Sequence, residues 1–365
     1  MMTAEPFLRA EAEPVRPAPP PARRGLVRTL FGDIVSAALS AACALLILLA
    51  VPRLANWAII HGVWSGVGTS CRGEGACWAF LAEKAPFILF GIYPADERWR
   101  PIIVVILFLL VTLWTLPVRN WTRPTLWLWG VSILVSLVLM GGGMVGLGEV
   151  PTTDWGGLPI TLLLTILSLA IGFPFAVALA LGRQSSLPLV RHASIAFIEV
   201  VRGLPLLSML FIAAILLPIM LPDGMTIDNL LRALVALTLS SAANLAEVLR
   251  GGLQGVSRGQ EEAARALGLG WFQTARLIVV PQAIRNVIPP LTNMAVVVVK
   301  NTSLVLVVGL FDLLSAGRAA LADPAWPDPY VETYLFIASI YFVICFGISR
   351  YAAWLERRML QGARR

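Results

Sequence analysis

A polar and strongly patterned segment, residues 251–285, joins two long apolar blocks of this sequence. Within it, Glu262-Ala263-Ala264 precedes Gly268, and after nine intervening residues Ile278 is followed by Val280-Pro281. Alanines let another protein approach closely, and a neighbouring carboxylate offers charge-assisted hydrogen bonds to basic groups. The chemistry that this pattern favours is recognition of a partner protein rather than the making or breaking of bonds.

Two short helical pieces are predicted for the segment. Ser257 and Gln260 have the spacing of a capping box, so a helix is expected over residues 258–265. A second piece is expected over residues 271–280, because Pro281 cannot continue the hydrogen-bond ladder. The segment is therefore predicted to fold as a helix-turn-helix.

Two glycines, Gly268 and Gly270, separate the predicted pieces and can supply the left-handed backbone that ends the first helix. We expect Gly268 to set the angle between the two pieces. The alternative is an amphipathic helix on the membrane surface, but such a helix requires bulky apolar anchors where this segment has alanines.

A lysine inside an apolar block is the second feature with chemical potential. Lys300 lies roughly midway along the block at about residues 286–310, and ionisable groups at membrane depth are functional candidates. Its polar neighbours are Asn301, Thr302 and Ser303. Together they can bind the carboxylate of a zwitterion or satisfy a locally opened backbone. The alternative is that Lys300 pairs with Glu247 or Glu199 only to hold helices together.

Four further polar residues are candidates for the same pathway. Glu199 and Arg202 lie one helical turn apart and are predicted to form either a gating pair or a stabilising pair. Asn244 and Glu247 share one helical face and either line the pathway or mediate helix packing.

The elements that position these residues are membrane helices. Of the 365 residues, 58% are hydrophobic and 13% are charged, a composition far from that of soluble domains. The predicted fold is an all-α, polytopic membrane helix bundle. Eight apolar blocks are long enough to span a bilayer, at about residues 32–52, 101–118, 126–147, 158–182, 198–222, 229–250, 286–310 and 333–355.

Orientation follows from the arginines, which concentrate at both chain ends and after the second, fourth and sixth blocks. By the positive-inside rule this side is the cytoplasm, and it holds both termini. The net charge of +7 is thus assigned to membrane topology rather than to nucleic-acid binding. Cys71 and Cys77 fall on the opposite side, where they are expected either to form a disulfide or to remain two unpaired thiols.

The chain is predicted to divide into a few regions along its length. They are a disordered cytoplasmic arm at 1–30, three additional N-terminal helices at 31–150 with a periplasmic insert at 53–100, a core at 151–357 that contains five helices and the loop 251–285, and a basic tail at 358–365. The only lysines, Lys84 and Lys300, do not follow a glycine-rich phosphate loop, so no ATP hydrolysis is expected on this chain. With two histidines, no metal site is expected.

The segment around Glu262 resembles the cytoplasmic loop of ABC importer membrane subunits, which reads Glu-Ala-Ala, three residues, Gly, nine residues, Ile, one residue, Leu-Pro. Val280 stands where the family has Leu. In that family the loop docks as a coupling helix into a cleft of the ATPase subunit. The resemblance therefore assigns the ATPase contact to Glu262, Ala263, Ala264, Arg265 and Gly268.

Other segments resemble the importers of polar amino acids, the histidine and glutamine type. They are Trp155-Gly156-Gly157, the run from Glu199 to Leu206 with Leu204 for Thr, and the run from Lys300 to Leu304 with Asn301 for Asp. The match covers about residues 153–357. The eight-span layout with its long insert resembles the M-type membrane subunit of the general L-amino-acid permease.

The resemblance implies a permease subunit of the bacterial inner membrane that carries polar L-amino acids. Its expected partners are an ABC ATPase subunit in two copies, a second permease subunit that is homologous or identical, a periplasmic amino-acid binding protein and membrane lipid. ATP and Mg would bind the ATPase, and no cofactor is expected on this chain. The alternatives are an ion-coupled secondary transporter, whose inverted repeats we do not find, and a membrane enzyme, whose convergent catalytic groups are missing from the sequence.

Overall fold

The computed structural model describes residues 30–73, 75–144, 146–222 and 224–362. Two compact units divide the chain between His61 and Gly62. The predicted arm at 1–30, apart from Leu30, and the last three residues of the basic tail lie outside the described residues.

The first unit consists of one long helix. Helix α2, Ile34–Ala55, continues as a π-helical turn, η1, Asn56–Ile60. Asp33 caps its start by accepting a hydrogen bond of 2.7 Å from the backbone N–H of Ser36. None of its residues is buried, and it is apolar on all sides, which is typical of a helix that crosses a membrane.

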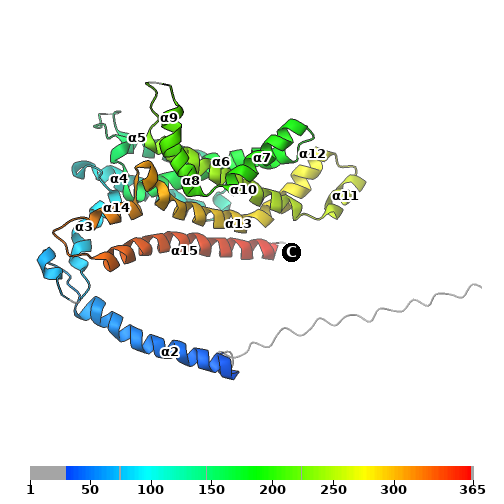
Figure 1. Ribbon diagram of the computed structural model, residues 1–365. Coiled ribbons are helices and arrows are strands. Elements are labelled where there is room, and N and C mark those ends of the chain that lie inside the picture. Colours follow the sequence, from blue (N-terminus) through cyan, green and yellow to red (C-terminus); the bar gives the residue numbers. More distant parts are fainter. Residues whose placement is uncertain (1–29, 74, 145, 223, 363–365) are drawn as a thin grey trace, which may run out of the picture. The chain divides into compact units, whose positions relative to one another are not determined.

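The second unit is a bundle of helices (Figure 1). The longer helices are α3 Trp78–Phe90, α4 Trp99–Thr115, α5 Arg123–Gly141, α6 Gly157–Arg183, α7 Pro188–Gly203, α10 Asn229–Gln254, α11 Arg258–Ala266, α13 Val280–Asn301, α14 Leu313–Ala320 and α15 Tyr330–Gly362. The shorter ones are α8 Leu206–Phe211, α9 Leu217–Met220 and α12 Trp271–Thr274. Short 3-10 and π-helical turns are η2 Gly68–Cys71, η3 Ala95–Glu97, η4 Val118–Asn120, η5 Thr152–Asp154, η6 Ile212–Leu216, η7 Ala275–Val279 and η8 Thr302–Val308, and the two-residue strand β1 is Phe311–Asp312.

The helical membrane fold predicted from composition is confirmed. Among the described residues, seven helices are long and apolar enough to cross a bilayer, and a bent pair makes eight if it counts as one span. That bent pair corrects the fifth predicted span, residues 198–222. Helices Pro188–Gly203 and Leu206–Met220 meet at 101°. Pro205 disfavours helical backbone at the preceding residue, and Leu204 is accordingly extended, at φ −90° and ψ 133°.

Helices α6 and α10 form the centre of the bundle, and small side chains let them approach closely. A Cβ added at Gly172 of α6 would lie 3.4 Å from the Cβ of Ser241 on α10. Ala176, Ala242 and Ala246 are buried in the same region. Close packing of small residues is the usual way in which helices associate in lipid, where burial of apolar surface gives no net gain.

A crossing of three glycines fixes the beginning of α6. Gly156 and Gly157 pair with the two residues of β1, and an added Cβ at Gly156 would lie 2.9 Å from the Cα of Gly91. Gly157 has a φ of +67°, and a Cβ there would lie 2.0 Å from the carbonyl oxygen of Leu89. Only glycine fits this crossing, which explains why two glycines follow Trp155 in the Trp155-Gly156-Gly157 segment.

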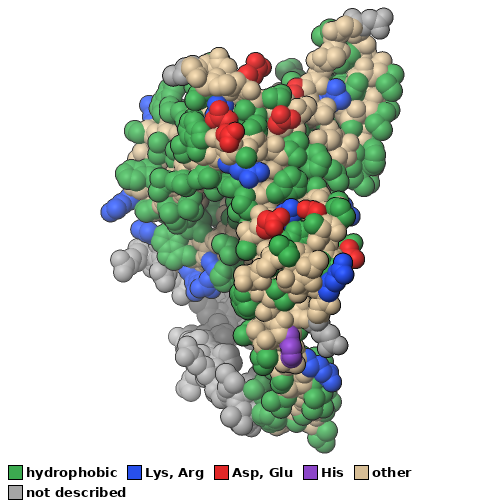
Figure 2. Space-filling view, turned by 90° about the vertical axis from the view of Figure 1, so that its left-hand side faces the viewer, with side chains coloured by type: hydrophobic (Ala, Val, Ile, Leu, Met, Phe, Trp, Pro, Cys, Tyr) green, Lys and Arg blue, Asp and Glu red, His purple; other side chains and the backbone are tan. Residues whose placement is uncertain are grey.

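The part of the insert from Gly62 onward packs on the core instead of forming a separate body. Phe80 and Ile88 from α3 are buried with Leu313, Ala320 and Ile337 of the core. The Nζ of Lys84 lies 2.6 Å from an oxygen of Asp323. In Figure 1, α3 and α14 lie at one end of this bundle, and α11 and α12 lie at the other. Figure 2 views the molecule toward the end that carries α3 and shows acidic and basic side chains in small groups among hydrophobic ones.

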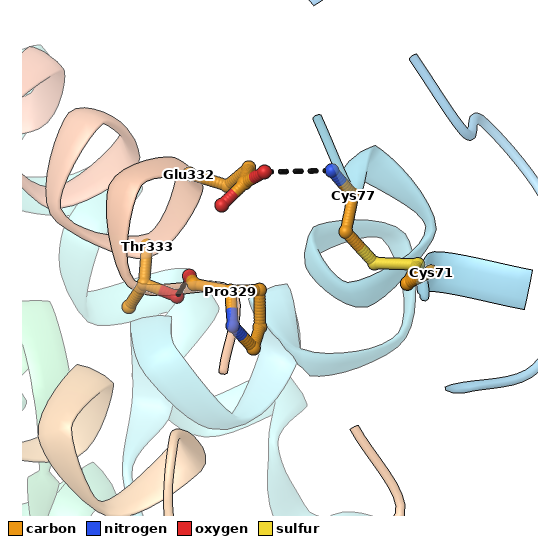
Figure 3. Close-up of a disulfide and its surroundings, with 5 residues drawn as sticks. All are labelled: Cys71, Cys77, Pro329, Glu332 and Thr333. Atoms are coloured by element: carbon orange, nitrogen blue, oxygen red, sulfur yellow. Dashed lines mark hydrogen bonds between the residues drawn. A yellow bond between two sulfur atoms is a disulfide. The ribbon is translucent and has the colours of Figure 1, made fainter. Parts of the chain in front are cut away.

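A disulfide joins Cys71 and Cys77 at this end, with their Cα atoms 5.4 Å apart. The backbone N–H of Cys77 donates a hydrogen bond of 2.7 Å to the carboxylate of Glu332 in the first turn of α15 (Figure 3). Glu332 is buried, so this bond gives a partner to a carboxylate that water does not reach. The disulfide loop is thereby attached to the beginning of α15.

Candidate functional site

The segment after α10 folds as an elbow of two helical pieces, α11 and α12, which is the predicted arrangement. Gly268, which follows α11, has the left-handed φ of +77°, so it forms the turn as the sequence predicts. Gly270 does not share this conformation. The angle of the elbow therefore depends on Gly268, because a left-handed backbone costs any other L-residue about 1–2 kcal/mol.

The predicted capping box is wrong, although the predicted start of α11 is right. Ser257 is the N-cap residue, but its side chain accepts no capping hydrogen bond. The side chain of Gln260 instead accepts a hydrogen bond of 3.2 Å from Gln282 of α13. A contact that is distant in sequence replaces the local one and attaches α11 to α13.

The predicted end of the second piece at Pro281 is also wrong. The chain continues from α12 through the π-helical turn η7 into α13, with Pro281 in the first turn of α13. A proline is tolerated there because the first N–H groups of a helix have no partner within it. The elbow is consequently continuous with the helix that carries Lys300.

The two alanines of the motif face different ways. Ala263 is exposed together with Glu262, whereas Ala264 has no exposed surface and packs within the chain. Large apolar side chains are also exposed on the elbow, with Leu267 at 79% and Phe272 at 65%. Arg265 is exposed and lies 3.9 Å from Glu261, a weak contact of the surface type. The outer side of the elbow therefore presents both apolar and acidic groups.

A cluster of five charged residues links α6, α7 and α10 just before the elbow. Glu247 of α10 lies within ion-pair distance of Arg183 at 3.3 Å, Arg202 at 3.8 Å and, more closely, Arg250. Arg183 also lies 3.3 Å from Glu199. We call these five residues the Glu247 cluster.

The Glu247 cluster corrects two sequence expectations. Glu199 and Arg202 do not pair with one another within the described part of the chain, but with Arg183 and Glu247 respectively. Lys300 forms no ion pair with Glu247 or Glu199 among the described residues. Arg183 and Arg250 were not expected as partners, although the spacing of three between Glu247 and Arg250 is a signal for such a pair.

The polar run from Lys300 to Ser303 lies where α13 changes into the 3-10 helix η8. Thr302 is buried and donates to the carbonyl of Val299 at 2.7 Å, and Ser303 donates to that of Lys300 at 2.7 Å. Their hydroxyls are thus engaged with local backbone. Lys300 is exposed and Asn301 is half-buried, so these two side chains remain the candidates for contact with a solute.

The predicted pathway residues do not lie together in one site. Asn244 donates a hydrogen bond of 2.9 Å to the carbonyl of Ser240 on its own helix, one turn before Glu247. Within the described residues, no side-chain hydrogen bond or ion pair connects Lys300 or Asn301 with the Glu247 cluster. The candidates therefore form two groups, one at the α13–η8 junction and one near the elbow.

Asp312 is a polar site that the sequence analysis missed. Its carboxylate is buried, caps α14 through the N–H groups of Leu314 and Ser315, and accepts a hydrogen bond of 3.2 Å from Tyr341 of α15. Burial raises its pKa above the usual range. Asp312, an N-cap residue type that directly precedes the apolar Leu313 and Leu314, was the available sign of a helix start.

The described residues thus form a polytopic helix bundle with an elbow at one end. Residues 172–361 match the family described as the binding-protein-dependent transport system inner membrane component, which is more than half of the chain. The chain belongs to this family and is a multi-pass membrane protein of the permease type.

Two relatives match almost the whole chain. The inner membrane amino-acid ABC transporter permease protein YhdY of Escherichia coli is 39% identical over 96% of this chain and 97% of its own length. The glutamate/glutamine/aspartate/asparagine transport system permease protein BztC of Rhodobacter capsulatus is 33% identical over 97% of this chain and 98% of its own. Both matches include the region before the core.

A solved structure supports the fold of the core. The crystal structure of an amino acid ABC transporter with histidines contains a chain that is 36% identical, with a TM-score of 0.51. The match covers 55% of this chain and 92% of that chain.

Proposed function

We propose that this chain carries polar L-amino acids through the bacterial inner membrane as the permease subunit of an ATP-driven importer. The single observation that carries the proposal is the elbow after α10, which combines the Glu262-Ala263-Ala264 motif with a left-handed Gly268. Support for the substrate class comes from the names of YhdY and BztC, both permeases of amino-acid transport.

The proposed assembly contains two ABC ATPase subunits that bind ATP and Mg, a second permease subunit that is homologous or identical, and a periplasmic amino-acid binding protein. In this assembly the elbow and both termini lie in the cytoplasm, and the disulfide end of the bundle faces the periplasm. The placement of α3 and α14 at the end of the bundle opposite α11 and α12 supports opposite sides for the disulfide end and the elbow (Figure 1).

The elbow contacts the ATPase through its exposed side. Leu267 and Phe272 would leave water on docking, and burial of each such side chain stabilises a contact by about 1.5–3 kcal/mol before the costs of association. Glu262 and Arg265 provide hydrogen bonds at the margin. Ala264 acts inside the elbow, where its small side chain allows close packing.

Two glycine substitutions test the coupling. At both Gly268 and Gly259, an added Cβ meets no atom within 4 Å, but only Gly268 has a positive φ. Gly268→Ala should change the angle between α11 and α12. It should thereby reduce solute-stimulated ATP hydrolysis and uptake, while the membrane helices remain folded. Gly259→Ala, within α11, should preserve both activities. Equal activity of the two variants in proteoliposomes would contradict this role of the elbow.

The substrate pathway includes the α13–η8 junction. Lys300 is positioned to bind the carboxylate of an amino acid, and Asn301 to donate or accept a hydrogen bond. Lys300→Met and Asn301→Leu should lower uptake with normal assembly, whereas Ser303→Ala, whose hydroxyl is engaged with local backbone, should have little effect. Unchanged transport by Asn301→Leu would count against this placement.

Co-purification separates the proposal from an ion-coupled transporter. The detergent-solubilised chain, isolated through an affinity tag from its native host, should retain an ATPase subunit, and uptake should require ATP. Uptake driven by an ion gradient in proteoliposomes that contain this chain alone would overturn the proposal.

A further inference from the structure

The final turns of α15 contain a hollow that the transport function does not explain. Its volume is about 560 Å³, and the described residues that line it are Arg350, Trp354, Arg357 and Arg358. These positions are separated by four, three and one residues, so they lie on one face of the helix. We call these four residues the arginine hollow.

The three guanidinium groups of the arginine hollow form no ion pair with a carboxylate in the part of the chain that the structure describes. Arg357 donates one hydrogen bond of 2.9 Å to the carbonyl of Ala353. Arg358 lies over the ring of Trp354, 5.2 Å from its centroid. The arginines of the Glu247 cluster, by contrast, have carboxylate partners. Three positive charges on one face therefore lack an anion, and the arginine fork matches phosphate geometry best.

The length of α15 places the arginine hollow in the headgroup layer of the bilayer. The helix has 33 residues and is about 50 Å long, whereas the hydrocarbon core is about 30 Å thick. Counted from Tyr330, about 20 residues cross the core, which brings the chain to Arg350. Phe342, Val343 and Phe346, which precede it, are exposed and apolar, as lipid-facing residues are.

Two aromatic residues hold the helix at this depth. Tyr351 donates a hydrogen bond of 2.8 Å to the carbonyl of Leu116 and stacks on Trp354 with ring centroids 5.7 Å apart. Trp and Tyr are enriched at the membrane interface because their rings are apolar and their tips are polar. Trp354 is thus in contact with both Tyr351 and Arg358.

We propose that the arginine hollow binds the phosphate group of an anionic phospholipid. The guanidinium groups of Arg350, Arg357 and Arg358 hold the phosphodiester, and Trp354 packs against the glycerol and the upper acyl chain. The depth of the site favours a lipid over a soluble anion, because the phosphates of the bilayer lie in this layer at high local concentration. Each arginine near an anionic surface contributes about 1 kcal/mol, which is a factor of about five in binding.

The test uses the full-length chain in detergent, with lipid binding measured by native mass spectrometry. Phosphatidylglycerol and phosphatidylcholine of identical acyl chains are titrated separately. The wild type should prefer phosphatidylglycerol, and Arg350→Gln/Arg357→Gln/Arg358→Gln should lose at least about tenfold in that binding. The matched control, Arg119→Gln/Arg123→Gln/Arg191→Gln, removes the same charge from three exposed positions outside the hollow and should keep the preference.

Two further measurements complete the test: competition with inorganic phosphate, and single variants in case the triple variant does not fold. Inorganic phosphate at millimolar concentration should fail to displace the lipid. If it displaces the lipid fully, the site serves a soluble anion and the proposal is overturned. If the triple variant does not purify, Arg350→Gln and Arg358→Gln are compared singly with Arg119→Gln, and each should weaken phosphatidylglycerol binding about threefold to fivefold. Equal binding of the two lipids by the wild type, or no difference between the hollow variants and their controls, would also overturn it.

Discussion

Replacement of Glu247 by glutamine would leave three arginines facing one another across α6, α7 and α10. The Glu247 cluster has three arginines and two glutamates, a net charge of +1, and Glu247→Gln raises it to +2. The carboxylate takes part in three of the ion pairs, so this single change removes most of the attraction in the cluster. We expect α7 to loosen from α10 at the end that precedes the elbow.

The magnitude follows from the exposure of the cluster. The Glu247 side chain is 23% exposed and its partners are 24–36% exposed, so solvent screens the charges. Exposed ion pairs contribute about 0.2–1 kcal/mol each, and the three lost pairs therefore amount to about 1–3 kcal/mol. For a chain of this size we expect the Tm to fall by about 1–4 °C.

The assay is thermal unfolding of the purified chain in detergent, followed by intrinsic tryptophan fluorescence. Glu356→Gln is the matched control, because Glu356 is exposed and forms no ion pair within the described residues. Adding Arg250→Gln to Glu247→Gln returns the cluster to +1 and should recover part of the loss. If Glu247→Gln and Glu356→Gln unfold at the same temperature, the cluster does not stabilise this end of the bundle.

Three further changes test the opposite end. Gly157→Ala should greatly reduce the yield of monodisperse protein in size-exclusion chromatography because its Cβ meets a carbonyl oxygen, whereas Gly143→Ala, at a φ of +72° in open space, should cost only about 1–2 kcal/mol. Cys71→Ala/Cys77→Ala should speed proteolysis of the insert, since closing so short a loop stabilises by about 2 kcal/mol; equal cleavage rates would contradict this. The hydrogen bond from Lys84 lowers the pKa of Asp323. The stability that this ion pair adds is therefore fully present above pH ~4, and it is lost as the pH falls through the lowered pKa of Asp323. Asp323→Asn should therefore lose less Tm than the wild type between pH 7 and pH 3, and an equal loss would exclude the pair as a contributor.

Features that depend on local sequence were predictable. The membrane helices follow from apolar length, and the turn at Gly268 follows from the preference of glycine for left-handed backbone. The bend at Leu204 was equally accessible, because Pro205 restricts its predecessor, but the apolar run on both sides of it suggested one continuous span. Apolar length alone therefore predicts the number of candidate spans better than it predicts the shape of each one.

Features that depend on contacts between distant segments were not predictable. Gln260 has the right spacing for a capping box, yet its side chain accepts a hydrogen bond from Gln282 of α13 instead. Glu199 has a nearer candidate in Arg202, yet pairs with Arg183 of α6. In each case two partners of similar chemistry compete, and only the packing of the helices decides between them.

The hydrogen bond that Glu332 receives comes from main chain, not from a side chain. Every amino acid except proline supplies the same N–H at position 77, so substitution there can break the sulfur bridge without depriving the acid of its donor. Glu332 thus constrains the path of the main chain at position 77 but not the identity of the side chain there. A different loop transplanted onto this bundle must therefore present a main-chain N–H to Glu332, and proline scanning, rather than alanine scanning, is the method that will detect this requirement.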